Sequence, residues 1–274
     1  MSQQYRLKSC FQVLAEQQRT ALIPFITAGD PLADASVDIM HALVDAGADV
    51  IELGIPFSDP MADGPVIQLA SERAIERGVS LRTVLQDVHN FRQNNQKTPV
   101  ILMGYLNPLY RMGFAQFAES AAAAGVDGVL IVDSPPEESV VLESLLAAVG
   151  ISMIRLVAPT TTAERMRLIA AEATGFIYYV ALKGITGAGS GANSDAESGQ
   201  RIKTMRELTG LPVAAGFGIK DAESAADWAQ LADAVVIGSA LVTRLAECES
   251  SGQACEAVKS FLAPIRIAMD NVTQ

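Results

Sequence analysis

The stretch ADVIELGIPFSDPMADGP, residues 48–65, joins a short apolar strand to a loop that carries several carboxylates. Apart from Glu52 and Gly54, residues 50–55 are all apolar, which is typical of a strand buried on both faces. Proline and glycine then interrupt the chain and indicate a loop. A buried carboxylate must be paired, solvated or protonated. The stretch therefore predicts a buried strand that carries a chemically unusual acid.

The same pattern, a short apolar run followed by a polar turn, occurs eight times. Segments with the polar faces of surface helices separate the runs. Eight strands that alternate with helices predict a (β/α)8 TIM barrel, and an open, doubly wound sheet is the alternative. The runs are ALIPFITAG (21–29), ADVIELGIP (48–56), PVILMGY (99–105), GVLIVD (128–133), ISMIRLVAP (151–159), GFIYYVAL (175–182), LPVAAGFG (211–218) and ADAVVIGS (232–239).

The chain shows no linker rich in serine and glycine, and no break in composition, so we expect residues 1–274 to form one barrel domain. An extra N-terminal helix over residues 9–18 would close the bottom of the barrel, and another helix over about 255–269 would follow the last strand. Two helix starts have capping-box spacing, Ser134 with Glu137 and Thr161 with Glu164.

Composition narrows the class of protein. The net charge is −11 and no cluster of lysine and arginine is present, which argues against nucleic-acid binding. No apolar run approaches the roughly 20 residues that cross a membrane, and the polar start does not resemble a signal peptide. The three cysteines form no CxxC pair, which suits the reducing cytoplasm. Only two histidines are present, so we expect no metal site.

The loops after the seventh and eighth strands predict a phosphate site. Gly216-Phe217-Gly218 ends the seventh run, and Gly238-Ser239 ends the eighth and leads directly into a helical segment. In TIM barrels these two loops commonly bind phosphate, because glycine allows close backbone approach and the helix start offers free N–H groups. The alternative is that these glycines only form tight turns.

The loop after the sixth strand, residues 183–195, is long and rich in glycine, which favours a lid that closes over a substrate. Thr186 could hold such a lid closed by a hydrogen bond. The alternative is a surface loop without function. Lys183 in this loop also raises the alternative of a Schiff-base aldolase.

Glu52 and Asp63 are the candidate catalytic acids. A carboxyl group in the apolar mouth of a barrel should have a raised pKa, which suits a general acid or an acid–base shuttle. For Glu52 the alternative is a buried salt bridge. For Asp59 and Asp63 the alternative is a role in turns, which Asp-Pro and Asp-Gly favour.

Taken together, these segments resemble the alpha chain of tryptophan synthase, over nearly the whole chain. The resemblance implies a carbon–carbon lyase of tryptophan biosynthesis, which cleaves indole-3-glycerol phosphate to indole and glyceraldehyde 3-phosphate. It implies no metal and no cofactor in this chain. The blocks that carry the resemblance are LIPFITAGDP, ELGIPFSDPMADGPVIQ, GVDGVLIVDSPPEES, KGITG, GFGI and IGSALV.

The resemblance also implies residue roles. Glu52 would be the main acid–base group, Asp63 would stabilise positive charge at the indole N–H, and Tyr178 would lie near the substrate glycerol. Thr186 would close the lid onto Asp63. The indole pocket would be lined by Phe25, Met103, Tyr105 and Phe217, and the backbone at Gly187, Gly218, Gly238 and Ser239 would hold the phosphate.

A partner is implied as well. The family's alpha chain binds a beta chain that carries pyridoxal phosphate. The two chains form an α2β2 heterotetramer, and indole passes from the alpha chain to the beta chain through a tunnel. The contact surface would include Asp59, Pro60, Asn107, Pro108 and Pro135. Two alternatives remain open from the residues alone: another phosphosugar barrel, such as an isomerase or epimerase, and a subunit that mainly binds and regulates its partner.

Overall fold

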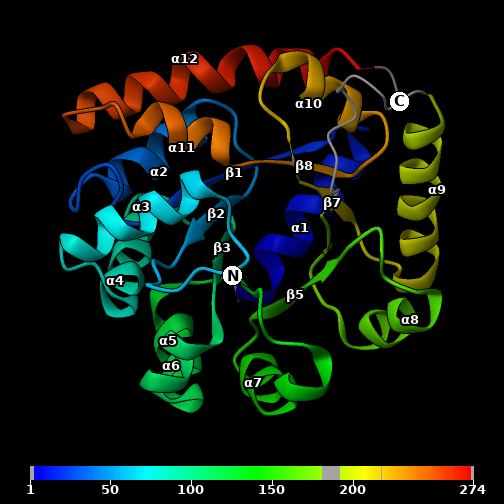
Figure 1. Ribbon diagram of the computed structural model, residues 1–274, viewed down its shortest axis with the longest axis horizontal. Helices are drawn as coiled ribbons and strands as arrows, with labels where there is room; N and C mark the ends of the chain where they lie inside the picture. The colour runs from blue at the N-terminus through cyan, green and yellow to red at the C-terminus, as the bar shows by residue number, and fades with distance from the viewer. Residues whose placement is uncertain (1–2, 181–191, 217, 273–274) are drawn as a thin grey trace.

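The computed structural model describes residues 3–180, 192–216 and 218–272. Eight parallel strands form a closed barrel in which each strand pairs with the next and β8 pairs with β1 (Figure 1). The (β/α)8 prediction is confirmed, and the open-sheet alternative is wrong. The strands are β1 (Ala21–Thr27), β2 (Ile51–Gly54), β3 (Val100–Gly104), β4 (Gly128–Ile131), β5 (Ser152–Val157), β6 (Ile177–Tyr179), β7 (Val213–Ala215) and β8 (Ala234–Ile237).

A ring of helices covers the barrel, and α12 packs against both α2 and α10, which joins the start of the ring to its end. Within the described residues, none of the helices is both long and apolar enough to cross a bilayer. The ring consists of α2 (Ser36–Asp45), α3 (Pro65–Glu76), α4 (Leu81–Arg92), α5 (Leu106–Met112), α6 (Phe114–Ala124), α7 (Pro136–Ala148), α8 (Ala163–Glu172), α9 (Ala192–Thr209), α10 (Ala222–Ala229), α11 (Ser239–Leu245) and α12 (Ser251–Asp270).

The two predicted capping boxes are wrong. Pro135 is the N-cap of α7 and offers no side-chain cap, so Ser134 lies one residue too early. Thr162, not Thr161, caps α8 by accepting a hydrogen bond from the Arg165 N–H, while Thr161 accepts one from Ala158.

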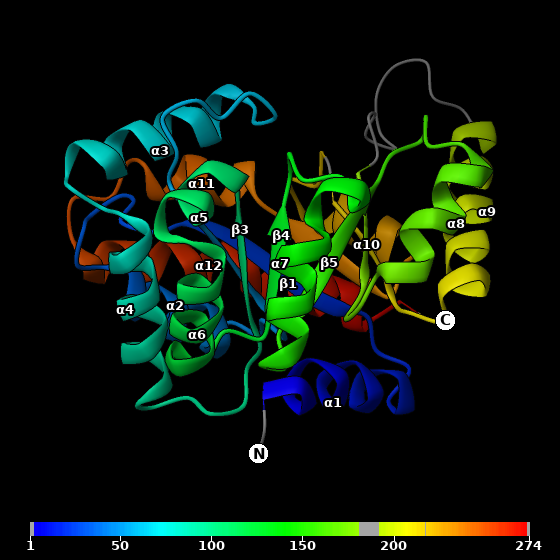
Figure 2. The same ribbon diagram turned by 90° about the horizontal axis from the view of Figure 1, so that it is seen from below.

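The extra N-terminal helix, α1 (Gln3–Glu16), closes one end of the barrel, as the sequence predicted. Figure 2 shows α1 across that end, on the opposite side of the molecule from α3. Leu7, Phe11 and Leu14 of α1 join the apolar side chains that point into the barrel, among them Val50 and Phe176. Apolar side chains of α1 therefore cover the bottom of the barrel.

An ion-pair network anchors the same end. The Asp127 carboxylate, which is buried, accepts hydrogen bonds from Arg6 Nε of α1 at 2.7 Å and from Arg92 Nη2 of α4 at 2.7 Å. The Val100 N–H donates to the same carboxylate. Because one buried carboxylate joins α1, α4 and β3, the barrel floor is held by both polar and apolar contacts.

We predict that Phe11→Ala lowers the free energy of unfolding by about 3–5 kcal/mol, because it empties the centre of the floor. The Phe11 ring lies 5.7 Å from the Phe176 ring, centroid to centroid. Urea unfolding would measure the loss. Val13→Ala on the same helix is the control, since Val13 is 48% exposed, and its effect should stay within about 0.5 kcal/mol. Equal losses in the two variants would contradict this account of the floor.

Candidate active site

Glu52 points into the barrel from β2. It pairs in register with Phe25 on one side and Ile101 on the other, and it follows the inward-facing Val50 by two residues. Glu52 is 1% exposed, and within the described ranges neither of its carboxyl oxygens has a hydrogen-bond partner. The salt-bridge alternative therefore has no support from the described residues.

The pKa of Glu52 is raised from its ordinary 4.5 to about 8, mainly by burial and to a smaller extent by the nearby Asp63. Burial acts this way because it disfavours the charged form. A carboxyl group with such a pKa holds its proton at neutral pH and can also release it. Glu52 is therefore suited to both halves of an acid–base cycle.

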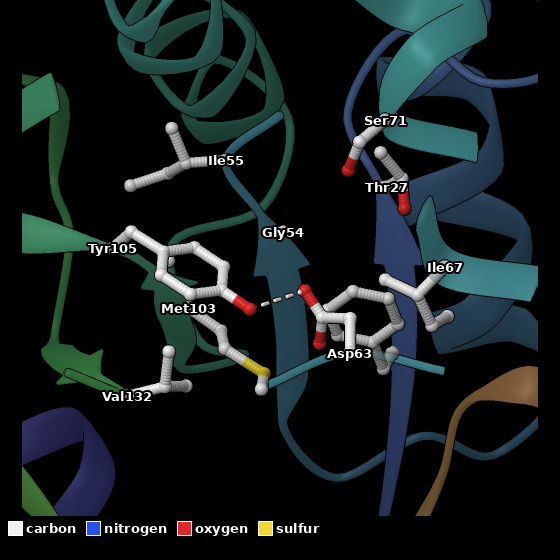
Figure 3. Close-up of a pocket in the computed structure, with 11 residues that line it drawn as sticks. Thr27, Gly54, Ile55, Asp63, Ile67, Ser71, Met103, Tyr105 and Val132 are labelled. Carbon is white, nitrogen blue, oxygen red and sulfur yellow. Dashed lines mark hydrogen bonds between the residues drawn. The ribbon is translucent and has the colours of Figure 1, made fainter. Parts of the chain in front are cut away.

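Several contacts hold Asp63 in place. The Tyr105 hydroxyl donates a hydrogen bond to the Asp63 carboxylate at 3.0 Å (Figure 3). The Ala62 N–H donates to the Tyr105 oxygen at 2.9 Å. The Gln68 amide donates to the Asp63 carbonyl at 2.9 Å. Burial raises the pKa of Asp63, and the Tyr105 hydrogen bond partly opposes that rise.

The cavity beside Asp63 has mostly apolar walls, which suit a flat aromatic ring. Gly54 makes room for one wall, because a Cβ there would lie 2.6 Å from the Phe25 ring. Three of the predicted indole-pocket residues, Phe25, Met103 and Tyr105, line this cavity. Figure 3 labels Met103 and Tyr105 among them. The full lining is Phe25, Thr27, Gly54, Ile55, Asp63, Ile67, Ser71, Met103, Gly104, Tyr105 and Val132.

Tyr178 lies inside the barrel on β6 and is buried. A Cβ at Gly216 would lie 2.4 Å from the Tyr178 hydroxyl, so glycine at that position makes room for the phenol. The pKa of Tyr178 is raised, first by burial and then by Glu52 and Asp63. The phenol therefore stays neutral and can donate a hydrogen bond near the two carboxyl groups.

The predicted phosphate residues are described only in part. Gly218 is exposed and has a φ of +69°, a conformation that favours glycine. Gly238 is the N-cap of α11, and Ser239 is the first, exposed residue of that helix. Thr186, Gly187 and Phe217 lie outside the described residues, as does Lys183. Their predicted roles remain predictions.

Asp59, Pro60 and Pro135 lie in loops that follow strands, as predicted, whereas Asn107 and Pro108 lie on the short helix α5 and not in a loop. Asp59 and Asn107 are exposed, and Pro60, Pro108 and Pro135 are half-buried. Two large side chains close to them in sequence are also exposed, Met61 by 83% and Tyr110 by 70%.

Sequence reasoning missed the α3 side of the cavity. Ile67 and Ser71 are four residues apart on α3 and therefore share a helix face that lines the cavity, and Thr27 lines it from β1. The four-residue spacing was the available signal. Within the ranges described, no group of three His, Cys, Asp or Glu side chains is placed to hold a metal ion.

Comparisons with known proteins point to one family. Residues 11–270 match the sequence profile described as "Tryptophan synthase alpha chain". A tryptophan synthase alpha chain of Xanthomonas axonopodis pv. citri is 54% identical over 97% of this chain and 98% of its own length, and one of Xylella fastidiosa is 54% identical over 98% and 99%. The crystal structure of tryptophan synthase subunit alpha from Legionella pneumophila has a TM-score of 0.89 at 42% identity, over 97% of this chain and 99% of that one.

The raised pKa of Glu52 predicts an unusual dependence of stability on pH. Between pH 4.5 and about 8 the folded chain keeps a proton that the unfolded chain has released, so the free energy of unfolding falls as pH rises. The slope approaches about 1.4 kcal/mol per pH unit. Glu52→Gln has no carboxyl group to hold this proton. In urea unfolding, its free energy of unfolding should therefore rise relative to that of the wild type from pH 5 to 8, with no further rise above pH 8. A difference that does not change with pH would contradict the raised pKa.

Proposed function

The chain belongs to the tryptophan synthase alpha chain family, whose reaction is the cleavage of indole-3-glycerol phosphate, and we propose which of its residues perform that reaction. The observation that carries the proposal is Glu52, a buried carboxyl group without a partner in the described residues and with a pKa of about 8. These relatives do not favour the alternatives of a phosphosugar isomerase or a purely regulatory subunit.

Glu52 acts as the acid and then as the base. It gives its proton to the indole carbon that bears the glycerol chain, which leaves the ring positively charged. The bond from that carbon to the glycerol chain then breaks, its electrons neutralise the ring, and the neighbouring hydroxyl becomes the carbonyl of glyceraldehyde 3-phosphate. The carboxylate form of Glu52 takes up the hydroxyl proton, so the protons balance over the cycle.

Asp63 stabilises the charged intermediate. Its carboxylate accepts a hydrogen bond from the ring N–H, where the positive charge develops, and the apolar walls strengthen this interaction. The hydrogen bond from Tyr105 supports this role, because it orients the carboxylate before the substrate binds. Phe25, Met103, Tyr105 and Phe217 enclose the ring.

The rest of the substrate lies towards β6, β7 and β8. Tyr178 donates its hydroxyl to the glycerol chain, near Glu52. The phosphate is held by backbone N–H groups at Gly187, Gly218, Gly238 and Ser239, with the start of α11 adding its favourable dipole. Thr186 closes over the site by bonding to Asp63.

The partner in this proposal is a beta chain that carries pyridoxal phosphate, in an α2β2 heterotetramer. It contacts Asp59, Pro60, Asn107, Pro108 and Pro135, and the exposed Met61 and Tyr110 support a contact there. We place this single-domain chain in the cytoplasm, where its three free cysteines stay reduced.

Glu52→Gln should lower indole release by at least about 10³-fold, and Asp63→Asn by about 10²-fold or more, because each removes a group that acts in the transition state. Indole release from indole-3-glycerol phosphate would be measured with a purified beta chain present. Binding of glycerol 3-phosphate is the control and should be nearly unchanged in both variants. If Glu52→Gln loses this binding as well, Glu52 has a structural role and the assignment is wrong.

Gly238→Asp should weaken glycerol 3-phosphate binding by at least about tenfold, because a carboxylate would face the phosphate and a side chain would block its approach. Gly252→Asp is the matched control: it makes the same charge change on α12, where nothing lies within 4 Å of the new Cβ. Calorimetry would compare the two affinities. Equal affinities would refute the phosphate assignment at Gly238.

A further inference from the structure

Helix α3 determines where Asp63 lies. It begins at Pro65, two residues after Asp63, and its Gln68 side chain donates to the Asp63 carbonyl. Its Ile67 and Ser71 side chains line the same cavity (Figure 3). A movement of α3 would therefore displace the catalytic carboxylate and one wall of the pocket together.

Apolar packing holds α3 through part of its surface, since its half-buried Val66 and Ile67 pack against the cluster that contains Phe25 and Val242. Its buried residues are the small Ala70, Ser71 and Ala74, whereas Leu69 is 53% exposed and Ile75 is 37% exposed. Small side chains bury little apolar area and so contribute little to holding a helix in place. Apolar packing has little directional preference, so a directional interaction would fix the position of α3 more closely.

A two-hydrogen-bond ion pair supplies it. Arg73 of α3 donates from Nε at 2.7 Å and from Nη2 at 2.8 Å to the two oxygens of Asp30, which is only 3% exposed. Arg77, at the end of the helix, adds a longer contact at 3.8 Å. The fork of a guanidinium on a carboxylate fixes both the distance and the direction between the two groups.

The segment that carries Asp30 is held by contacts with neighbouring elements. It follows β1 directly, and the Gly29 N–H donates to the buried Ser36 hydroxyl of α2 at 2.9 Å. Gly29 has a φ of +78°, and a Cβ there would lie 2.3 Å from Val79, just beyond α3. Asp30 therefore offers α3 a fixed point on the barrel.

We propose that Asp30 and Arg73 are positioning residues for the lyase reaction: their ion pair holds α3, and thereby holds the Asp63 carboxylate where the ring N–H of the substrate binds. The inference rests on the proposed role of Asp63. Neither residue touches the substrate. Their effect passes through helix α3, and a misplacement of about 1 Å at a reacting group can cost about 10²-fold in rate.

The test is a double-mutant cycle on indole release from indole-3-glycerol phosphate, with a beta chain present. Arg73→Met should lower kcat/KM by about 10-fold to 10²-fold, mostly through kcat. In the Asp63→Asn background the same change should cost less than about threefold, because the carboxylate that it displaces is already gone. Arg73→Lys should recover little, since lysine keeps the charge but loses the fork.

Arg206→Met is the matched control. Arg206 donates from Nε to Asp233 at 2.7 Å. The Arg206 side chain is 39% exposed and the Arg73 side chain 29%. Asp233 lies at the other end of the barrel, just before β8. We expect this variant to lose some stability in urea unfolding and to keep its kcat/KM. Glycerol 3-phosphate binding should be unchanged in both variants, which checks that each is folded.

The outcomes separate the two proposals. If Asp63→Asn keeps full activity, the proposed role of Asp63 is wrong and the route through it fails too. If Asp63→Asn is impaired but Arg73→Met is fully active, the positioning role alone is wrong. The same holds if Arg73→Met lowers kcat/KM by the same factor in the Asp63→Asn background as in the wild type. If Arg206→Met loses as much activity as Arg73→Met, the loss reflects lower stability and not a displaced Asp63, and the inference is wrong.

Discussion

The site depends on one constraint: a carboxyl group, Glu52, held inside a closed barrel without a partner among the described residues. The fold creates this situation. β2 turns Glu52 inward, α1 closes the barrel below it, and apolar side chains fill the layer between them. An ionised carboxylate is costly in such a place, so the group keeps its proton. Because burial destabilises the charged form, it raises the pKa of Glu52 towards neutral pH, where the group can both give and take up a proton.

Asp63 complements Glu52 because the two carboxyl groups lie in different surroundings. Glu52 is fully buried and unpaired in the described part of the chain, whereas Asp63 is half-buried and accepts a hydrogen bond from Tyr105. Two acids in unlike environments can take unlike roles, one giving a proton and the other holding negative charge. Glycines also shape the site: Gly54 gives space to Phe25 and Gly216 gives space to Tyr178.

The sequence predicted the parts of this structure that depend on local pattern. The eight strands are visible because strands buried on both faces are continuous apolar runs, and Glu52 stands out as a charge within one. The predicted caps at Ser134 and Thr161 were wrong because neighbouring residues compete for the same helix start, and spacing alone does not decide between Thr161 and Thr162.

Contacts between distant segments could not be predicted. Tyr105 was expected only to line the indole pocket, yet its hydroxyl donates a hydrogen bond to Asp63, 42 residues away. Arg73 bonds to Asp30, 43 residues away. Such pairs depend on how the loops of neighbouring strands meet at the barrel mouth, and no local pattern encodes that geometry. The same holds for Thr27 and Ser71, which belong to different elements and meet only at the cavity.

The most direct test is to titrate the Glu52 carboxyl itself by carbon NMR, with Glu52→Gln to assign its signal. A pKa near 8 is expected in the wild type. In Asp63→Asn the pKa should fall but stay well above 4.5, because burial is the larger cause and the Asp63 charge the smaller. A carboxyl group that titrates near its ordinary 4.5 would contradict the account, since it would be ionised at neutral pH and could not supply the proton that the cleavage requires.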